Sequence, residues 1–373
     1  MSEYQYYEFR TVNRQLTASE RAAVAKLSSH GETTATSFSV NYSYGSFKHE
    51  PEEVLTRYFD LFFYIANWGS VQLIFRYPKE LIDTRALEPY CLEGQRIIDY
   101  KVVDDHVILR FELNHEDGGF GWTEGEGMVD GVVGLYEEIM QRDYRALYLA
   151  WLGAIQDGTE YSDEFDDETL EPPLPPGLHA LSPALQEFVN LFELDEHLIA
   201  AAAQGSTPPP PTKQIDQATA LATLSKAESI DFLQRLLQGE AHLELKLKQR
   251  LGLLPINVGY APTGQRTVGE LLATRHELEQ IRQKAAAAAK EVQRRARLAA
   301  LVAQGDSAWQ DVETLIEKQT SEGYKQAVAL LLQLGELARE QQQDRIFASR
   351  VEAIRARYRR RSGLMRLLEQ AQL

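Results

Sequence analysis

The spacing of hydrophobic and polar residues changes about halfway along the chain, and this change predicts two kinds of structure. The first half contains short segments rich in aromatic and β-branched residues, which are typical of strands. In residues 38–44, Phe, Val and Tyr alternate with Ser and Asn, as expected for a half-buried strand. The same criteria predict further strands at 4–12, 71–77, 97–103 and 106–113, the last two joined as a hairpin at residues 104 and 105.

Helix signals lie between these strands. Thr17 and Glu20 have the spacing of a capping box, which predicts a helix running to about Ser29. Pro51 begins a second predicted helix that continues through RYFDLFFYIANWG to Gly69, with its tryptophan buried at the C-terminus. Helical spacing over 132–155 predicts a third long helix that covers the sheet.

The second half is helical throughout. Residues 267–304 lack proline and contain KAAAAAK, and further helices are predicted at 308–320, 323–339 and 344–373. Their apolar stripe is sparse, which favours long antiparallel helix pairs, as in a coiled coil. We therefore predict an α+β fold, with a mixed N-terminal sheet and packed helices followed by an extended all-α region of long antiparallel helices.

Two segments of unusual composition suggest where domains begin and end. DGTEYSDEFDDETLE is strongly acidic and is followed by PPLPPG, and GSTPPPPT favours a stiff polyproline conformation. The predicted organisation is therefore an α+β sandwich domain at 1–156, an acidic and proline-rich connection at 157–181, a helical segment at 182–204, a polyproline linker at 205–212 and a helical domain at 213–373.

Charge is distributed unevenly along these 373 residues. Residues 1–200 sum to −22 and residues 201–373 to +6, which together give the net charge of −16. The acidic half should repel nucleic acid, so only the C-terminal part is expected to approach phosphates, and then weakly. The single Cys91 excludes an intramolecular disulfide framework and a CxxC zinc site. No run is apolar enough for a membrane span, so we expect a cytoplasmic protein without membrane contact.

The loop HEDGGFGWTEGEG, residues 115–127, is the stretch that looks most like a catalytic or metal-binding loop. Its imidazole and carboxylates are possible ligands for a divalent cation, although their spacing matches neither an EF-hand nor an HExxH motif. We favour a flexible acidic connection held to the core by Phe120 and Trp122. Nucleotide and nucleophile motifs are absent from the sequence, and we predict no catalytic, cofactor-binding or metal-binding residues and no cofactor.

The strongest cluster of positive charge lies near the C-terminus. It consists of Arg357, Tyr358, Arg359, Arg360 and Arg361, which we predict to contact a partner. The partner is either another protein, the acidic half of the same chain, or a nucleic acid with Tyr358 stacked on a base. A solvated helix end remains the alternative, because positive charge is favourable there.

The first 90 or so residues contain the segments YYEFRTV, TSFSVNYSYGSF and RYFDLFFYIANWG, and the sequence given ends in SGLMRLLEQAQL. These three segments, and more loosely the ending, resemble an uncharacterised bacterial protein family that is associated with genes for SWIM-type zinc-binding proteins. The resemblance implies a bacterial cytosolic protein and no assigned activity. The cysteine pattern of the associated zinc site is absent from this chain.

These patterns favour a non-catalytic adaptor or scaffold that binds another protein through long helices. A metal-dependent enzyme using the loop at 115–127 is the first alternative, and a nucleic-acid-associated protein using the C-terminal arginines is the second. The identity of the protein partner is not encoded in any motif.

For the loop we expect no tight metal site, because ordering a glycine-rich chain costs about 1–2 kcal/mol per residue fixed. Calorimetric titration of the full chain with Ca²⁺, Mg²⁺, Mn²⁺ and Zn²⁺ should show no micromolar binding. Micromolar binding that disappears when His115→Ala and Asp117→Ala are combined would instead favour the enzyme.

Overall fold

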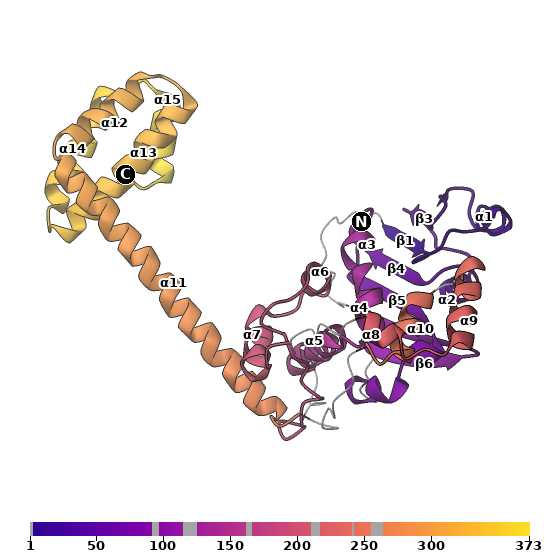
Figure 1. The fold of residues 1–373 in the computed structure, drawn as a ribbon. Coiled ribbons are helices and arrows are strands. Elements are labelled where there is room, and N and C mark those ends of the chain that lie inside the picture. Colours follow the sequence, from indigo (N-terminus) through magenta and orange to yellow (C-terminus); the bar gives the residue numbers. More distant parts are fainter. Residues whose placement is uncertain are drawn as a thin grey trace. The chain divides into compact units, whose positions relative to one another are not determined.

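The computed structural model describes residues 3–91, 97–114, 125–161, 166–209, 217–240, 242–254 and 264–373 (Figure 1). The chain forms two compact units, Met1–Glu279 and Gln280–Leu373. The boundary falls inside a long helix, α11 (Val268–Gln304), whereas the sequence predicted a linker at 205–212. The predicted α+β class with a helical C-terminal region is confirmed.

The N-terminal unit is built on a sheet that, in the described residues, has seven strands in the order β2-β3-β1-β4-β5-β7-β6. Every pairing in it is antiparallel, whereas we predicted a mixed sheet. The strands are β1 (Gln5–Arg10), β2 (Glu32–Thr33), β3 (Ser37–Tyr42), β4 (Leu61–Ala66), β5 (Ser70–Pro78), β6 (Ile98–Val103) and β7 (His106–Asn114). The predicted hairpin is confirmed, and Asp104 turns it with φ = 52°.

The central strand β4 corrects the prediction of one helix from Pro51 to Gly69. The helix α2 (Pro51–Tyr58) ends after eight residues, and LFFYIA then pairs with β1 and β5. Because both faces of β4 are buried, its apolar run shows no alternation, and its aromatic residues also fit a helical spacing. Residues 67–69 form the hairpin turn, with Gly69 at φ = 98° and Trp68 partly exposed rather than buried.

Helices cover both faces of the sheet (Figure 1). On one face, α1 (Ala18–Val24) and α2 enclose a core with Phe9, Phe38 and Phe62, and Thr17 and Glu20 form the predicted capping box. The other face carries the larger core. There the predicted third helix is divided into α3 (Met128–Val132), α4 (Gly134–Met140) and α5 (Arg145–Tyr161), which pack with α6 (Pro183–Leu191) and α7 (Glu196–Gly205). Ser182 caps α6, at the start of the helical segment predicted at 182–204.

The two proline-rich segments lie within the first unit and hold each other in place. Pro172, Pro173 and Pro175 are buried, and the hydroxyl of Tyr90 donates to the Pro173 carbonyl at 2.8 Å. Ser206 is also buried, and its Oγ donates to the Pro175 carbonyl at 2.8 Å. The amide of Gly177 donates to the Thr207 carbonyl at 2.8 Å. The described start of the predicted polyproline linker is therefore held in place by hydrogen bonds of Ser206 and Thr207, although residues 207–209 are exposed.

A buried carboxylate fixes the start of α11. Glu171 is only 2% exposed and accepts hydrogen bonds from Arg266 Nε at 3.0 Å, Arg266 Nη2 at 2.8 Å and the Tyr148 hydroxyl at 2.7 Å. Arg266 Nη1 also donates to the Ala201 carbonyl at 2.9 Å. Burial is the largest single influence on the pKa of Arg266 and lowers it, but the hydrogen bonds and negative charge of Glu171, together with Tyr148, more than offset burial and raise that pKa. This cluster joins α5, α7 and the residues before α11.

The first unit also contains α8 (Gln217–Leu221), α9 (Lys226–Leu237) and α10 (Leu243–Arg250). Short 3₁₀ turns lie between Lys79 and Tyr90. The described residues contain no helix that is both long and apolar enough to cross a membrane.

The C-terminal unit contains the end of α11 and four shorter helices. They are α12 (Ser307–Glu317), α13 (Ser321–Glu340), α14 (Asp344–Arg357) and α15 (Ser362–Gln370), around a core with Val312, Leu331 and Leu364. Gly305, between the helices predicted at 267–304 and 308–320, turns the chain after α11 with φ = 56°. All ten residues 281–290 are exposed, so the described residues do not show the antiparallel helix pairing predicted for α11 over this stretch. Alanine-rich composition favours an exposed helix without a packed partner.

The Glu171–Arg266 pair makes a stability prediction. Glu171→Gln should lower the free energy of unfolding by about 3 kcal/mol, because it leaves a partly buried guanidinium without its countercharge. Chemical denaturation of the full chain measures this loss, and hydrogen exchange should rise at the start of α11. Arg85→Gln, which breaks an exposed pair with Asp83, is the matched control with almost no expected effect. Equal losses in both variants would contradict the anchoring role.

Candidate interaction surfaces

The structure describes little of the loop that the sequence singled out as a possible catalytic or metal-binding loop. Most of the loop at 115–127 lies outside the described residues, which include only 125–127 of it. Within the described part of the chain, no group of three or more His, Cys, Asp or Glu is arranged to hold a metal. Burial, together with the charges of Asp99 and Glu88, raises the pKa of the Cys91 thiol to about 12. Cys91 is therefore a neutral thiol and not a nucleophile at neutral pH.

The C-terminal arginine cluster lies at the junction of α14 and α15, and the tyrosine at its centre is buried. Tyr358 is 6% exposed, and the guanidinium carbons of Arg357 and Arg361 lie 5.3 and 4.8 Å from the centre of its ring. Burial is also the main reason that its pKa is raised. A ring held in this way belongs to the core of the unit and is not exposed for stacking on a base.

Acidic residues of α12 already engage part of this cluster. Arg357 Nη1 lies 2.8 Å from Glu313 Oε2, and the Tyr358 hydroxyl donates to Glu317 Oε1 at 3.4 Å. Arg361 donates to the backbone carbonyl of Ile316. The other two arginines of the cluster, Arg359 and Arg360, are exposed, and the described residues show no ion pair for either of them. Two exposed guanidinium groups allow only weak, salt-sensitive contact with a polyanion.

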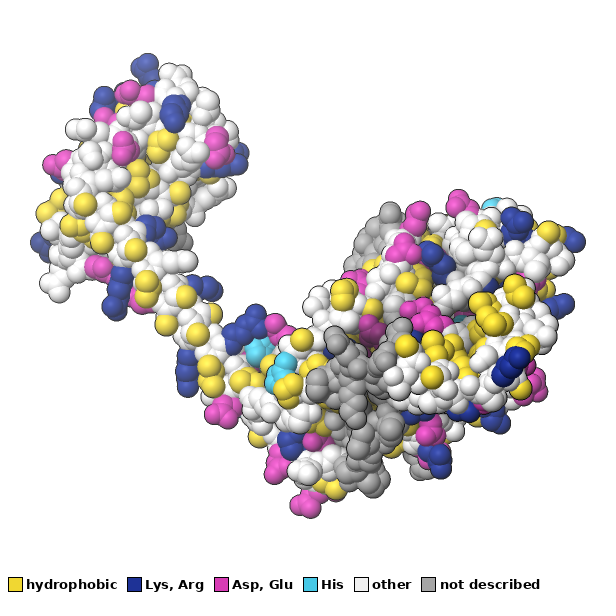
Figure 2. All heavy atoms as spheres, viewed as in Figure 1, with side chains coloured by type: hydrophobic (Ala, Val, Ile, Leu, Met, Phe, Trp, Pro, Cys, Tyr) yellow, Lys and Arg dark blue, Asp and Glu magenta, His cyan; other side chains and the backbone are white. Residues whose placement is uncertain are grey.

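A second surface, which the sequence did not reveal, is an apolar groove on α8, α9 and α10, here called the leucine groove. Its volume is about 420 Å³, and it is lined by Leu221, Leu224, Ser229, Phe232, Leu233, Leu236, Leu243, Glu244 and Leu247. Figure 2 shows hydrophobic side chains gathered over these helices. Leu233, Leu236 and Leu237 are 59, 62 and 88% exposed, which is unusual for neighbouring leucines on the surface of a folded unit.

The charged residues around the leucine groove are paired with one another. Arg235 binds Glu240 and Asp231, with Nε 2.6 Å from Glu240 Oε2. Arg250 lies 2.6 Å from Glu228, and Lys248 lies 2.6 Å from Glu244. Ser225 and Glu228 form a capping box that fixes the start of α9. The groove therefore offers a rigid apolar surface with little unbalanced charge, and apolar burial must dominate recognition there.

The helical pattern of α9 was visible in the sequence, but the exposure of its leucines was not. Ile230, Leu233 and Leu237 have the spacing of one helix face, which equally fits a face buried in the core. Only the structure shows that this face remains uncovered by the described residues of the unit.

Comparison of the chain with protein-family models, with curated proteins and with solved structures found no match. The resemblance to an uncharacterised bacterial family therefore stays a prediction.

The exposed arginines make a prediction about nucleic acid. The full chain should bind a DNA oligonucleotide weakly and only at low salt, and Arg359→Glu with Arg360→Glu should abolish this binding. Fluorescence anisotropy at two salt concentrations measures it, and Arg85→Glu with Lys79→Glu gives the same change of charge outside the cluster. Tight binding at high salt, or an equal loss in the control, would contradict a contact through these two arginines.

Proposed function

We propose that the protein is a non-catalytic adaptor whose leucine groove binds an amphipathic helix of a partner protein. The observation that carries this proposal is the group of exposed leucines on α9 that borders a groove between packed helices. Helix-binding grooves of this kind accept apolar residues spaced at i, i+3 or i+4, and i+7 along the partner.

The energetics favour a partner with large apolar side chains. Each leucine or phenylalanine of the partner that is fully removed from water contributes about 1.5–3 kcal/mol to the free energy of binding. The exposed leucines of the groove contribute in the same way when the partner covers them. The paired charges at the rim contribute specificity more than affinity. The proposal therefore predicts binding that changes little with salt, in contrast to contact through the arginines.

A phage-displayed library of random peptides, selected on the immobilised full chain, tests this function. Selected sequences should have amphipathic helical spacing of Leu, Ile, Phe or Met. Leu233→Glu and Leu236→Glu should each weaken their binding by about 30-fold, because a carboxylate would be buried in an apolar contact. Titration of synthetic versions of the selected peptides measures this change.

The controls separate recognition from folding and from self-association. Ile281→Glu places the same charge at another exposed apolar position on a helix and should leave the affinity unchanged. Circular dichroism should show that each variant keeps its helix content. Selection of no helical peptides, or equal binding by the groove variants, would contradict the proposal. A full chain that sediments as a dimer and becomes monomeric with Leu233→Glu would show that a second copy occupies the groove.

A further inference from the structure

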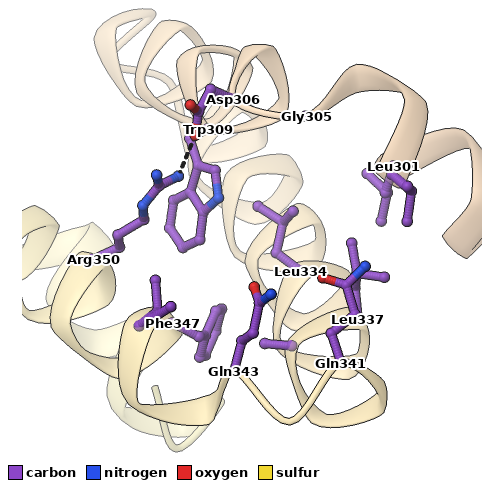
Figure 3. A pocket seen from close by; sticks show the side chains of 13 residues that line it. Leu301, Gly305, Asp306, Trp309, Leu334, Leu337, Gln341, Gln343, Phe347 and Arg350 are labelled. Atoms are coloured by element: carbon purple, nitrogen blue, oxygen red, sulfur yellow. Dashed lines mark ion pairs between the residues drawn. The ribbon is translucent and has the colours of Figure 1, made fainter.

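The C-terminal unit contains a separate cavity where four helices meet. Its volume is about 350 Å³, with walls from Leu301 of α11, Trp309 of α12, Leu334 and Leu337 of α13, and Phe347 of α14 (Figure 3). This volume is at the small end of the range of about 300–1,000 Å³ found for ligand pockets. The cavity therefore suits one or two side chains and not a whole helix.

Packing fixes the aromatic walls in place. The rings of Trp309 and Phe347 lie 5.8 Å apart at 51° to each other. Phe347 rests against Gly335, where an added Cβ would lie 2.9 Å from the ring. The guanidinium of Arg350 lies 5.2 Å from the centre of the Trp309 ring, and its Nη1 is 2.7 Å from Asp306 Oδ1. A rigid aromatic pocket beside a cation is a favourable anchor site for a partner side chain.

Polar groups at the rim have the chemistry needed to recognise a peptide. Figure 3 shows the carboxamides of Gln341 and Gln343 extending into the cavity from the turn between α13 and α14. Each carboxamide both donates and accepts hydrogen bonds, as does a peptide backbone. Gln342 between them has φ = 57°, and the Gln343 amide donates to the Ala338 carbonyl at 2.7 Å, so the turn is closed by backbone bonds.

Charge indicates the kind of peptide. Residues 280–373 contain 17 Lys and Arg and 11 Asp and Glu, a net charge of +6. The Arg350–Asp306 pair is exposed to solvent, with 79% of the Asp306 side chain accessible, so an incoming carboxylate can exchange with Asp306 at little cost. We propose that this cavity binds an acidic peptide segment of a partner protein, which inserts a bulky apolar side chain against Trp309 and places a carboxylate on Arg350.

The test uses ¹⁹F NMR of the full chain labelled with 5-fluorotryptophan. The signal that disappears in the variant Trp309→Phe is the signal of Trp309. The probe is the acetylated and amidated peptide Glu-Glu-Leu-Phe-Glu-Glu. It should shift the Trp309 signal in a saturable way and leave the signals of Trp68 and Trp151 unchanged. Peptides with Ser-Ser in place of Leu-Phe, or with Lys in place of Glu, should cause no such shift.

Two variants on α14 separate contact in the cavity from general charge. Arg350→Gln should weaken the peptide about fivefold, whereas Arg345→Gln removes the same charge outside the cavity lining and should leave the affinity unchanged. Thermal unfolding of both variants shows whether the unit stays folded. Leucine-groove variants should keep the response, so this proposal can fail or succeed independently of the proposed function.

Three results would overturn the inference. They are an unchanged Trp309 signal at saturating peptide, equal weakening by Arg350→Gln and Arg345→Gln, and an equal shift with the lysine peptide. A DNA oligonucleotide that shifts the Trp309 signal with the same dependence on Arg350 would assign the cavity to nucleic acid instead.

Discussion

The attachment of the start of α11 to the first unit depends on a buried ion pair, because Glu171 is a nearly inaccessible carboxylate that needs a compensating charge. Arg266, 95 positions along the chain from Glu171, donates two hydrogen bonds to it from its side chain and one from its backbone amide, and the Tyr148 hydroxyl donates a fourth. The surrounding backbone fits tightly: a Cβ at Gly264 would lie 2.0 Å from Glu171 Cγ, and one at Gly205 would lie 3.1 Å from Arg266 Cζ. A charge buried in this way is costly without its partner. The pair therefore explains why the residues that begin α11 belong to the first unit although the sequence places them in the helical half.

Local chemistry made some elements predictable. Capping boxes at Thr17 and Ser225 act within four residues, and the Asp104 turn joins two neighbouring strands, so a short stretch of sequence holds the necessary information for each. Other elements depend on distant partners. The pattern of β4 resembles a helix because the cores on the two sides of the sheet bury both of its faces. The prolines at 172–176 resemble a linker because Tyr90 and Ser206 are far away in the sequence. Tertiary contacts, and not local propensity, decide these segments.

The candidate surfaces show the same limit. A run of arginines is visible in the sequence, but whether they are free to bind a partner is not. Residues of α12 engage three members of the cluster: Glu313 pairs with Arg357, Glu317 accepts from Tyr358, and the Ile316 carbonyl accepts from Arg361. The leucine groove, in contrast, is not marked by any unusual pattern in the sequence. Its residues have ordinary amphipathic spacing, and only their exposure distinguishes an interaction surface from a core. The sequence therefore revealed a group of positive charges of which only part is available, because Arg357 and Arg361 are already engaged. It did not reveal the apolar area that the described residues leave uncovered.

The two units differ in the physical interaction that their candidate surfaces offer a partner, and this difference fits the proposed adaptor role. Residues 1–279 have 22 Lys and Arg and 44 Asp and Glu, a net charge of −22, yet the leucine groove on that unit is apolar and its rim charges are paired. Residues 280–373 carry +6 and combine an aromatic cavity with Arg350. Apolar burial is nearly independent of salt, whereas charge-assisted contact weakens as salt screens it. Surfaces that respond so differently to the same solution conditions suit two chemically distinct protein partners better than one shared substrate.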